Sequence, residues 1–445
     1  MNQLVDSLIK ATEKQIAVPE VALRSLIRTR RLIESAPTNL NLVQNADAWA
    51  VASHQVSNGK SFNYSKIVLA SSPGDIFEIP TPTQHKEQVG RRGFTFIDLF
   101  AGIGGFHLAL GRAGGHCVFA SEWDNSARRT YAFNHGIVPF GDIRDFTRQD
   151  HLPKDESALR SMVPYADVIA AGFPCQPFSQ AGVSSRNFHG QSHGLECDVQ
   201  GTLFEDILII ARAVKPKILL LENVSNLARH DSGNTLRTIF SEIEASGYEI
   251  FPRRPSPSNT GWAVIDSSSV VGQRRRRVYF ACIRKDLVEQ FGEFTFPTFP
   301  KPQVPHSLRA IIDRDQSMTE AEKLETYSIS PRLWESHLKR EKQHINRSNG
   351  FRIGLVSNLA EPAPTLVARY YKDGKDCLIP NRFDPTLPPR MLTPRECALL
   401  QTYPDDFWLP DAKTPAYKQL GNSITVEIAA KISKALAKKY LGNAG

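Results

Sequence analysis

The chain has 445 residues, more than one compact core accommodates, so we expect two or three domains. Hydrophobic residues make up 41% of it and charged residues 22%, and no apolar run approaches the ~20 residues of a membrane span. The net charge of +8 favours a polyanionic partner such as nucleic acid, and nothing in the composition points to a membrane.

The cysteines are spread along the chain without a C-x-x-C pair. This spacing argues against a disulfide framework and against a cysteine-rich zinc site, so we expect no metal. The first residues have neither the basic region nor the long apolar core of a signal peptide. Together these features predict a protein of the reducing cytoplasm. The six cysteines are Cys117, Cys175, Cys197, Cys282, Cys377 and Cys397.

Residues 1–90 are expected to form a helical extension that ends in a linker. Apolar residues recur at helical spacing from Leu4 to Ile33, which predicts about two helices. Arginines between residues 24 and 31 give the second helix a basic face, which either contacts phosphate or is simply solvated. The proline-containing stretch 79–83 is typical of a linker.

The pattern of a nucleotide-binding βαβ unit follows. Residues 94–100 read as a strand, 101–105 as a glycine-rich turn, 106–113 as a helix and 117–120 as a second strand. The turn lacks the full dinucleotide spacing, so it does not imply phosphate binding. Its glycines do let a ligand approach the backbone closely.

Two acids and a tryptophan then occupy the positions at which such units bind a nucleoside. Glu122 lies 20 positions beyond Gly102, where an acid commonly binds ribose hydroxyls, and Trp123 offers a flat face for adenine. Asp142 follows at another expected strand end. The glycine turn alone is also compatible with mere tight packing, but with these residues it favours an adenosine-containing cofactor.

A cysteine between two prolines follows the next buried strand. Residues 168–171 form the apolar run, and Gly172-Phe173-Pro174-Cys175-Gln176-Pro177-Phe178-Ser179 places the cysteine in a stiff loop at the strand's carboxyl end. Open α/β sheets build their sites at this edge. A lone cysteine is often a core residue, but two prolines and a glycine favour a positioned nucleophile. The glycine-punctuated stretch before the expected helix 202–213 is typical of a functional lid.

Charged residues also end or begin the later strands. Glu222 follows the apolar run 218–221 and should point into the same crevice as Cys175, although a helix-capping role is the simpler alternative. The arginine run 274–277 leads into the strand 278–281. Strand alternation should turn Arg275 and Arg277 to one face, whereas a solvated charge run is the alternative.

The regular strand–helix alternation ends near residue 286. A basic, aromatic and irregular stretch at 364–374 has the side chains to contact both phosphates and base edges, although ordinary surfaces show such mixtures too. A final helix is expected over about 425–440, packing back on the first domain.

In this order, the motifs resemble those of the bacterial DNA (cytosine-5)-methyltransferases. The matching stretches are 96–105, 172–179, 222–224, Gln273-x-Arg275-x-Arg277, 392–397 and 421–423. Further stretches at 122–123, 141–145, 201–204 and 368–374 are similar to the Dcm-like branch of the restriction–modification methylases. The resemblance covers residues 91–445.

The resemblance implies an α/β architecture of four parts. We expect the N-terminal extension at 1–90, then a Rossmann-like S-adenosylmethionine-binding catalytic domain with a mixed sheet at 91–285. A smaller irregular target-recognition domain would occupy 286–414, and 415–445 would carry the helix that returns to the catalytic domain. A monomer is expected.

The resemblance also implies the catalytic roles. Cys175 would add to carbon 6 of a cytosine flipped out of the duplex, Glu222 would contact ring nitrogen 3 and the amine, and Arg277 would hold the carbonyl oxygen. Arg275 would support Arg277 or contact phosphate. The expected catalytic set is Cys175, Glu222, Arg277, Arg275, Gln176 and Ser179.

S-adenosyl-L-methionine would be the cofactor and double-stranded DNA the macromolecular partner. Residues expected at the cofactor are Phe100, Ala101, Gly102, Ile103, Gly105, Glu122, Trp123, Asp142, Ile143, Pro174, Leu203, Asn422 and Ser423. Residues expected at DNA are Thr365, Leu366, Arg369, Tyr370, Tyr371 and Lys372, with a CC(A/T)GG-like target. A restriction endonuclease acting on the same site is a further partner to consider. Two alternatives remain, an RNA cytosine-5 methyltransferase and a non-catalytic DNA-binding regulator.

Overall fold

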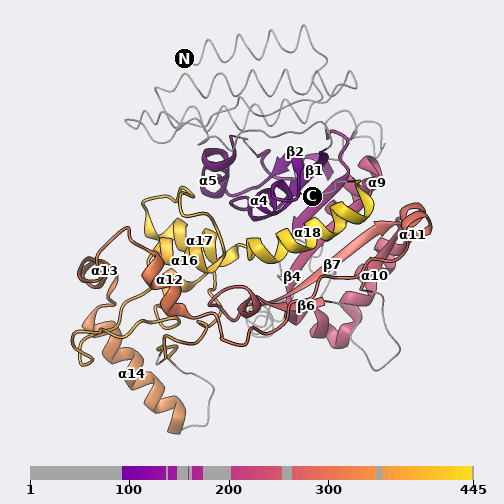
Figure 1. Cartoon of the computed structure of the whole chain (residues 1–445). Coiled ribbons are helices and arrows are strands. Elements are labelled where there is room, and N and C mark those ends of the chain that lie inside the picture. Colours follow the sequence, from indigo (N-terminus) through magenta and orange to yellow (C-terminus); the bar gives the residue numbers. More distant parts are fainter. Residues whose placement is uncertain are drawn as a thin grey trace, which may run out of the picture. The chain divides into compact units, whose positions relative to one another are not determined.

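The structure is a computed structural model, and it describes residues 93–136, 139–147, 159, 163–173, 202–252, 263–346, 353–356 and 358–442. The extension predicted over 1–90, the cysteine loop from residue 174 onward and the expected lid lie outside the described residues. Element labels are those of Figure 1.

A mixed sheet organises the first half of the described chain. Its strand order is β2-β1-β3-β4-β7-β5, with β6 paired to β7. Strands β2, β1, β3 and β4 are parallel, whereas β7 runs antiparallel to both β4 and β5. The strands are β1 Phe94–Leu99, β2 Gly115–Ser121, β3 Val168–Gly172, β4 Ile218–Val224, β5 Tyr248–Phe251, β6 Ala263–Asp266 and β7 Arg276–Arg284. The predicted mixed α/β sheet is therefore confirmed.

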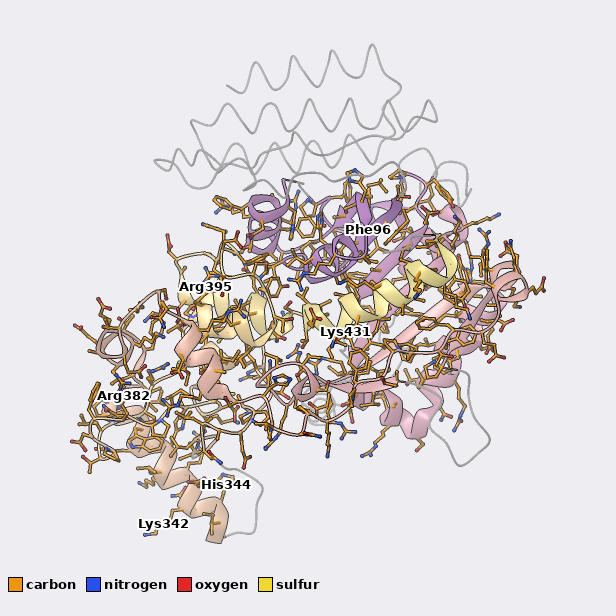
Figure 2. The ribbon with its side chains drawn as sticks, in the orientation of Figure 1. Phe96, Lys342, His344, Arg382, Arg395 and Lys431 are labelled. Atoms are coloured by element: carbon orange, nitrogen blue, oxygen red, sulfur yellow. The ribbon has the colours of Figure 1, made fainter. Side chains whose placement is uncertain are left out.

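The central strands are buried on both faces, which explains why they read as continuous apolar runs. Phe96 and Ile97 of β1, Ile169 of β3 and Leu219 of β4 have no exposed surface; Phe96 is labelled in Figure 2. The chain places β2 on one side of β1 and β3 on the other. The carboxyl ends of β1 and β3 therefore flank a topological switch point, where open α/β sheets bind their ligands.

Helices connect the strands of this sheet. They are α4 Gly105–Gly111, α5 Asn125–His135, α6 Arg144–Thr147, α9 Thr202–Val214, α10 Asn234–Ala245 and α11 Lys285–Phe291, with the 3₁₀ segments η2 Ser225–Gly233 and η3 Ser267–Ser269. The strand expected before Asp142 is reduced to one parallel bridge, Ser121 to Phe140. The carboxylate of Asp124 accepts from the backbone N–H groups of Ser126 and Ala127 and so begins α5.

The chain packs into two compact units. One contains the sheet up to Val264, residues 277–297 and the chain from Ala429 onward; the other contains 265–276 and 298–428. Helix α18, Val426–Tyr440, matches the final helix expected over 425–440, and from Ala429 onward it belongs to the unit with the sheet. The predicted functional boundaries after residues 90, 285 and 414 remain a prediction.

The second unit is largely irregular; among its described residues the regular structure is mostly short helices, with isolated bridges in place of a sheet of its own. Its helices are α12 Leu308–Arg314, α13 Glu320–Tyr327, α14 Pro331–Asn346, α15 Tyr370–Asp373, α16 Pro394–Leu400 and α17 Lys413–Asn422. A fully buried carboxylate, that of Glu396 in α16, connects this helix to α13 and to Arg390: it accepts from the guanidinium of Arg390 at 2.8 and 3.0 Å and from Lys323 Nζ at 3.2 Å. Charged side chains thus replace part of an apolar core here.

Candidate functional site

Glu222 and Arg277 form an ion pair near the end of β4. Glu222 lies in β4 and Arg277 in β7. These strands are antiparallel and place Glu222 opposite Tyr279 and Val224 opposite Arg277. Arg277 Nε lies 3.0 Å from Glu222 Oε1, and the two side chains expose 16% and 9% of their surface. A pair this poorly solvated is costly to form. Its position at the carboxyl end of a central strand, where ligands bind, favours a functional role.

Burial along the arginine run follows the predicted alternation. Arg274 and Arg276 are exposed, whereas Arg275 is buried and Arg277 is half-buried. A period of two therefore turns the second and fourth arginines inward. The guanidinium of Arg275 donates to three backbone carbonyl oxygens, those of Leu366, Gly421 and Ser423.

The strand that leads to the cysteine loop lies directly beside Glu222. Gly172, the last residue of β3, is the strand partner of Glu222 in β4. Cys175 follows three residues further along the chain. Its own position is outside the described residues, as are those of Pro174, Gln176 and Ser179. The chain nonetheless tethers Cys175 to the strand end beside Glu222.

The other described cysteines are poor candidates for a nucleophile. Cys117, Cys282, Cys377 and Cys397 are all buried with free thiols. Burial raises the pKa of each thiol, that of Cys377 to about 12, so the reactive thiolate is suppressed.

The glycine-rich turn after β1 contains three residues in the left-handed region, which two glycines adopt readily and Phe100 adopts only with strain. Phe100, Gly102 and Gly104 have φ angles of 53°, 55° and 88°. A Cβ on Gly104 would lie 2.0 Å from His135 Nε2, so the imidazole occupies the space that the glycine leaves. A Cβ on Gly102 would meet no atom within 4 Å, which leaves that side of the turn open to a ligand.

Glu122 ties this turn to the helix after β2. Its Oε2 accepts from the N–H of Gly102 at 2.8 Å, and its Oε1 accepts from the N–H of Asp124 at 2.8 Å. Burial raises the pKa of this carboxyl group. Trp123 follows with 68% of its surface exposed, an uncommon state for a large aromatic side chain. The structure therefore joins the acid to the turn, and the exposed aromatic side chain follows directly after that acid in the chain.

The remaining residues predicted at the cofactor are less closely grouped. Ala101, Ile103, Gly105 and Ile143 are buried, and Leu203 in α9 is half-buried. The carboxylate of Asp142 pairs with Arg144 and accepts from its Nε at 2.9 Å. Asn422 ends α17 in the other unit and is exposed; Ser423 Oγ lies 2.5 Å from Tyr403 Oη.

The residues predicted at DNA divide into exposed and buried members. Arg369, Tyr371 and Lys372 are exposed and Thr365 is half-buried. Leu366 and Tyr370 are buried, and the phenol of Tyr370 donates to Cys377 O while accepting from the N–H of Leu392. These two side chains support the segment from inside.

Sequence reasoning assigned no role to two residues that shape these segments. Gln273 is fully buried; its Oε1 accepts from the N–H of Leu366 and its Nε2 donates to Leu400 O. Its place at the start of the Gln-x-Arg-x-Arg motif was the available signal. His135, whose Nε2 lies 3.2 Å from Ile103 O and whose ring stacks on that of His107, had no such signal.

Two kinds of feature are absent from the residues that the structure describes. No group of three or more His, Cys, Asp and Glu side chains is placed there to hold a metal ion. None of the helices that the structure describes has the length and apolar character needed to cross a membrane.

Comparisons with known proteins agree on one family. The family model for the C-5 cytosine-specific DNA methylase matches residues 94–438. The DNA-cytosine methyltransferase of Escherichia coli strain K12 is 38% identical over 393 residues, which cover 81% of this chain and 80% of that protein. The type II methyltransferase M.DsaV of Dactylococcopsis salina is 35% identical over 356 residues, 79% of this chain and 87% of that protein. The solved structure of S. pombe Dnmt2 methyltransferase aligns with a TM-score of 0.51 at 19% identity, over 78% of this chain and 98% of that one, and shows the same fold.

Proposed function

We propose, because the chain belongs to the C-5 cytosine-specific DNA methylase family, that it methylates carbon 5 of one cytosine in a short duplex sequence and takes the methyl group from S-adenosylmethionine. Membership of the family confirms the resemblance predicted from the order of the motifs. The chain is accordingly an enzyme of the DNA-cytosine methyltransferase class.

The poorly solvated ion pair of Glu222 and Arg277 supports this proposal most directly. Cytosine presents an amine, ring nitrogen 3 and a carbonyl oxygen along one edge. A protonated Glu222 can donate to nitrogen 3 while accepting from the amine, and the guanidinium of Arg277 can donate to the carbonyl oxygen. Because the two side chains lie 3.0 Å apart, they can contact neighbouring atoms of one ring. Both contacts strengthen as negative charge develops on the ring.

Cys175 would be the nucleophile. Its thiolate adds to carbon 6, and the electron pair of the 5,6 double bond moves to carbon 5, which becomes nucleophilic. After carbon 5 is methylated, a base removes the carbon-5 proton; the bond between sulfur and carbon 6 then breaks, restoring the double bond and the thiolate. The raised pKa of the four described cysteines and the tether from Gly172 to Cys175 both support this assignment. Gln176 and Ser179 would shape the same loop.

The turn after β1 fits an adenosine-containing methyl donor. The open side of Gly102 admits the ligand close to the backbone, and the exposed indole of Trp123 can stack on adenine. Glu122, already fixed by two N–H groups, has lone pairs left for ribose hydroxyls. When bound, S-adenosylmethionine supplies an electrophilic methyl group on a sulfonium. The other residues proposed to hold it are Phe100, Ala101, Ile103, Gly105, Asp142, Ile143, Pro174, Leu203, Asn422 and Ser423.

Recognition of DNA is assigned to the second unit. None of the proposed catalytic groups can act on a stacked base, so the cytosine must leave the duplex. Thr365, Arg369, Tyr371 and Lys372 are the accessible side chains for contacts with phosphates and base edges, and Leu366 and Tyr370 hold the segment in place. A CC(A/T)GG-like target remains the leading hypothesis, based on the Dcm-like stretch 368–374.

The biological setting is inferred from the relatives. Several are named type II methyltransferases, including M.DsaV and M.HpaII of Haemophilus parainfluenzae, 33% identical over 367 residues. We propose that this chain likewise protects host DNA as a monomer in the cytoplasm, at the nucleoid. A restriction endonuclease cutting the same site would then be its functional counterpart, and this role does not require the two proteins to form a complex.

Bisulfite sequencing tests the proposal. Plasmid DNA from cells that express the full chain should contain protected cytosines at one short sequence. Replacing Cys175 with Ser removes the nucleophile and should abolish protection, because an alkoxide does not form readily at neutral pH.

Cys197→Ser is the matched control, since it makes the same chemical change at a second cysteine, and it should leave protection intact. Protection that survives Cys175→Ser would exclude Cys175 as the nucleophile. Absence of protected cytosines with the unmodified chain would overturn the DNA activity and direct the search to RNA.

A further inference from the structure

Arg275 joins two segments of the second unit to which the proposed function assigns different ligands. We name residues 363–372 the recognition segment and residues 421–423 the cofactor segment. The guanidinium of Arg275 donates to Leu366 O in the first, at 2.7 Å, and to the carbonyl oxygens of Gly421 and Ser423 in the second, at 3.1 and 2.5 Å. The side chain is 2% exposed.

The cofactor segment needs donors because it lies at the end of a helix. Helix α17 ends at Asn422, and the last carbonyl groups of a helix have no partner within it. Gln401 Nε2 donates to Leu420 O at 3.2 Å, and Arg275 donates to the next carbonyl along the chain, that of Gly421. A cation is also favourable at the negative end of the helix dipole. Arg275 therefore holds the end of α17.

The two segments also touch through their backbones. A Cβ on Gly421 would lie 2.4 Å from the carbonyl carbon and oxygen of Val367 and 2.5 Å from the N–H nitrogen of Ala368. Only glycine allows this approach. A displacement of the recognition segment must therefore be accommodated by the cofactor segment, and the reverse.

The recognition segment is also bonded to the three residues that directly precede Arg275. The N–H of Ala363 donates to Gly272 O at 2.7 Å, and the N–H of Leu366 donates to Gln273 Oε1 at 2.9 Å. Thr365 Oγ1 donates to Arg274 O at 2.6 Å. Arg277, the proposed ligand of the target base, follows two residues after Arg275.

We propose that Arg275 is a positioning residue that couples recognition of the DNA sequence to binding of the methyl donor. The inference rests on the proposed function, which assigns Asn422 and Ser423 to the donor and the recognition segment to DNA. Bonds to three backbone carbonyl oxygens leave the buried guanidinium poorly placed to contact phosphate. Coupling of this kind is reciprocal, so each ligand increases the affinity for the other by the same factor.

The test measures the affinity of the full chain for S-adenosylhomocysteine, an unreactive probe. The affinity is measured with and without a duplex that contains the target sequence of the enzyme. For the unmodified full chain the duplex should increase the affinity by at least ~5-fold, the lower end of typical coupling. Arg275→Lys keeps the charge, but one ammonium group cannot reproduce the planar donors that span both segments. In this variant the duplex should increase the affinity for the probe by less than ~2-fold. The kcat measured with both ligands saturating should change much less than the KM values for the two ligands.

Arg274→Lys is the matched control, because Arg274 is the adjacent arginine and its side chain forms an exposed ion pair with Glu361. In the Arg274→Lys variant the duplex should increase the affinity for the probe by the same factor as in the unmodified chain. If Arg275→Lys does not fold, Tyr403→Phe, which removes the bond between the phenol and Ser423 Oγ in the cofactor segment, must lower the coupling factor by a smaller amount.

An unchanged factor in the folded Arg275→Lys variant would overturn the proposal, since it would leave Arg275 a structural role alone. So would an unmodified chain that binds the probe and methylates DNA without any coupling. A chain that neither binds the probe nor methylates DNA would instead contradict the proposed function.

Discussion

Both units of the molecule bury apolar side chains, and the second also has a fully buried ion pair in its interior. In the unit with the sheet, the strands bury residues such as Ile97, Ile169 and Leu220 completely. In the other unit the fully buried positions include Arg390 and Glu396.

The difference follows from how each backbone is satisfied. Strand ladders pair the N–H and carbonyl groups of a sheet, so its side chains are free to be apolar. The second unit has isolated bridges and short helices, and polar side chains complete its backbone pairing. Lys323 donates to Asp315 O, Tyr417 donates to Leu392 O, and Gln273 donates to Leu400 O. An irregular fold thus requires long side chains with several donors, such as Arg390 and Arg275.

The largest expected effect comes from breaking the buried network. Arg390→Met removes both bonds to Glu396 and leaves a buried carboxylate with less compensation. We expect the free energy of unfolding in urea to fall by about 3–5 kcal/mol. The exposed pair of Arg314 and Asp405 provides the control, because Arg314→Met should cost at most about 1 kcal/mol.

The double variant Arg390→Met with Glu396→Leu sharpens this prediction. The second change removes the uncompensated charge that the first one leaves. The loss in free energy of unfolding of the double variant should therefore be smaller than the sum of the losses of the two single variants. Strict additivity would mean that apolar packing, rather than charge compensation, holds this unit as well.

For a core substitution in the sheet, the loss of stability should depend on the side-chain volume that is removed. Leu220→Ala in β4 should cost about 2–5 kcal/mol by opening a cavity, whereas Leu220→Met should cost less than about 1.5 kcal/mol. Urea unfolding followed by circular dichroism measures both. Equal losses in the two variants would show that shape, not buried volume, controls the sheet core.

The smallest effect is a difference in pH dependence. Burial raises the pKa of Asp98 in β1, helped by the charge of Glu122 and opposed by bonds from the His107 N–H and from Tyr131. Burial acts in the same direction on Asp315, but bonds from Ser317 and Thr393 and the charge of Lys323 lower its pKa overall. The two carboxyl groups should therefore respond to pH in opposite ways.

The signs follow from linkage. The stabilising contribution of Asp98 is present below the pKa of an unfolded aspartate and is lost as pH rises through its folded pKa; that of Asp315 is present above the unfolded pKa and is lost as pH falls through its folded pKa. Asp98→Asn should thus improve stability relative to the unmodified chain most at neutral pH, and Asp315→Asn should reduce it most there. Melting temperatures between pH 2 and 8 measure both, because the contribution of Asp315 is lost only below the pKa of an unfolded aspartate; parallel curves for the two variants would contradict these signs.

The sequence alone determined the features that depend on local order along the chain. Buried parallel strands need apolar runs, so the central strands could be predicted from those runs, and the site role of Glu222 from its place directly after one of them. A period of two determined which arginines of the run 274–277 turn inward. The order of the motifs was sufficient to predict the family to which the chain belongs.

The tertiary structure alone decided what those side chains meet. The acceptors of Arg275 lie 91, 146 and 148 positions along the chain, and no periodicity encodes such distances. Likewise Tyr370, in a stretch that reads as a surface, is buried because its phenol bonds Cys377 O and the N–H of Leu392. Partners of this kind are selected by folding, since an irregular backbone leaves polar groups that only side chains distant in sequence can reach.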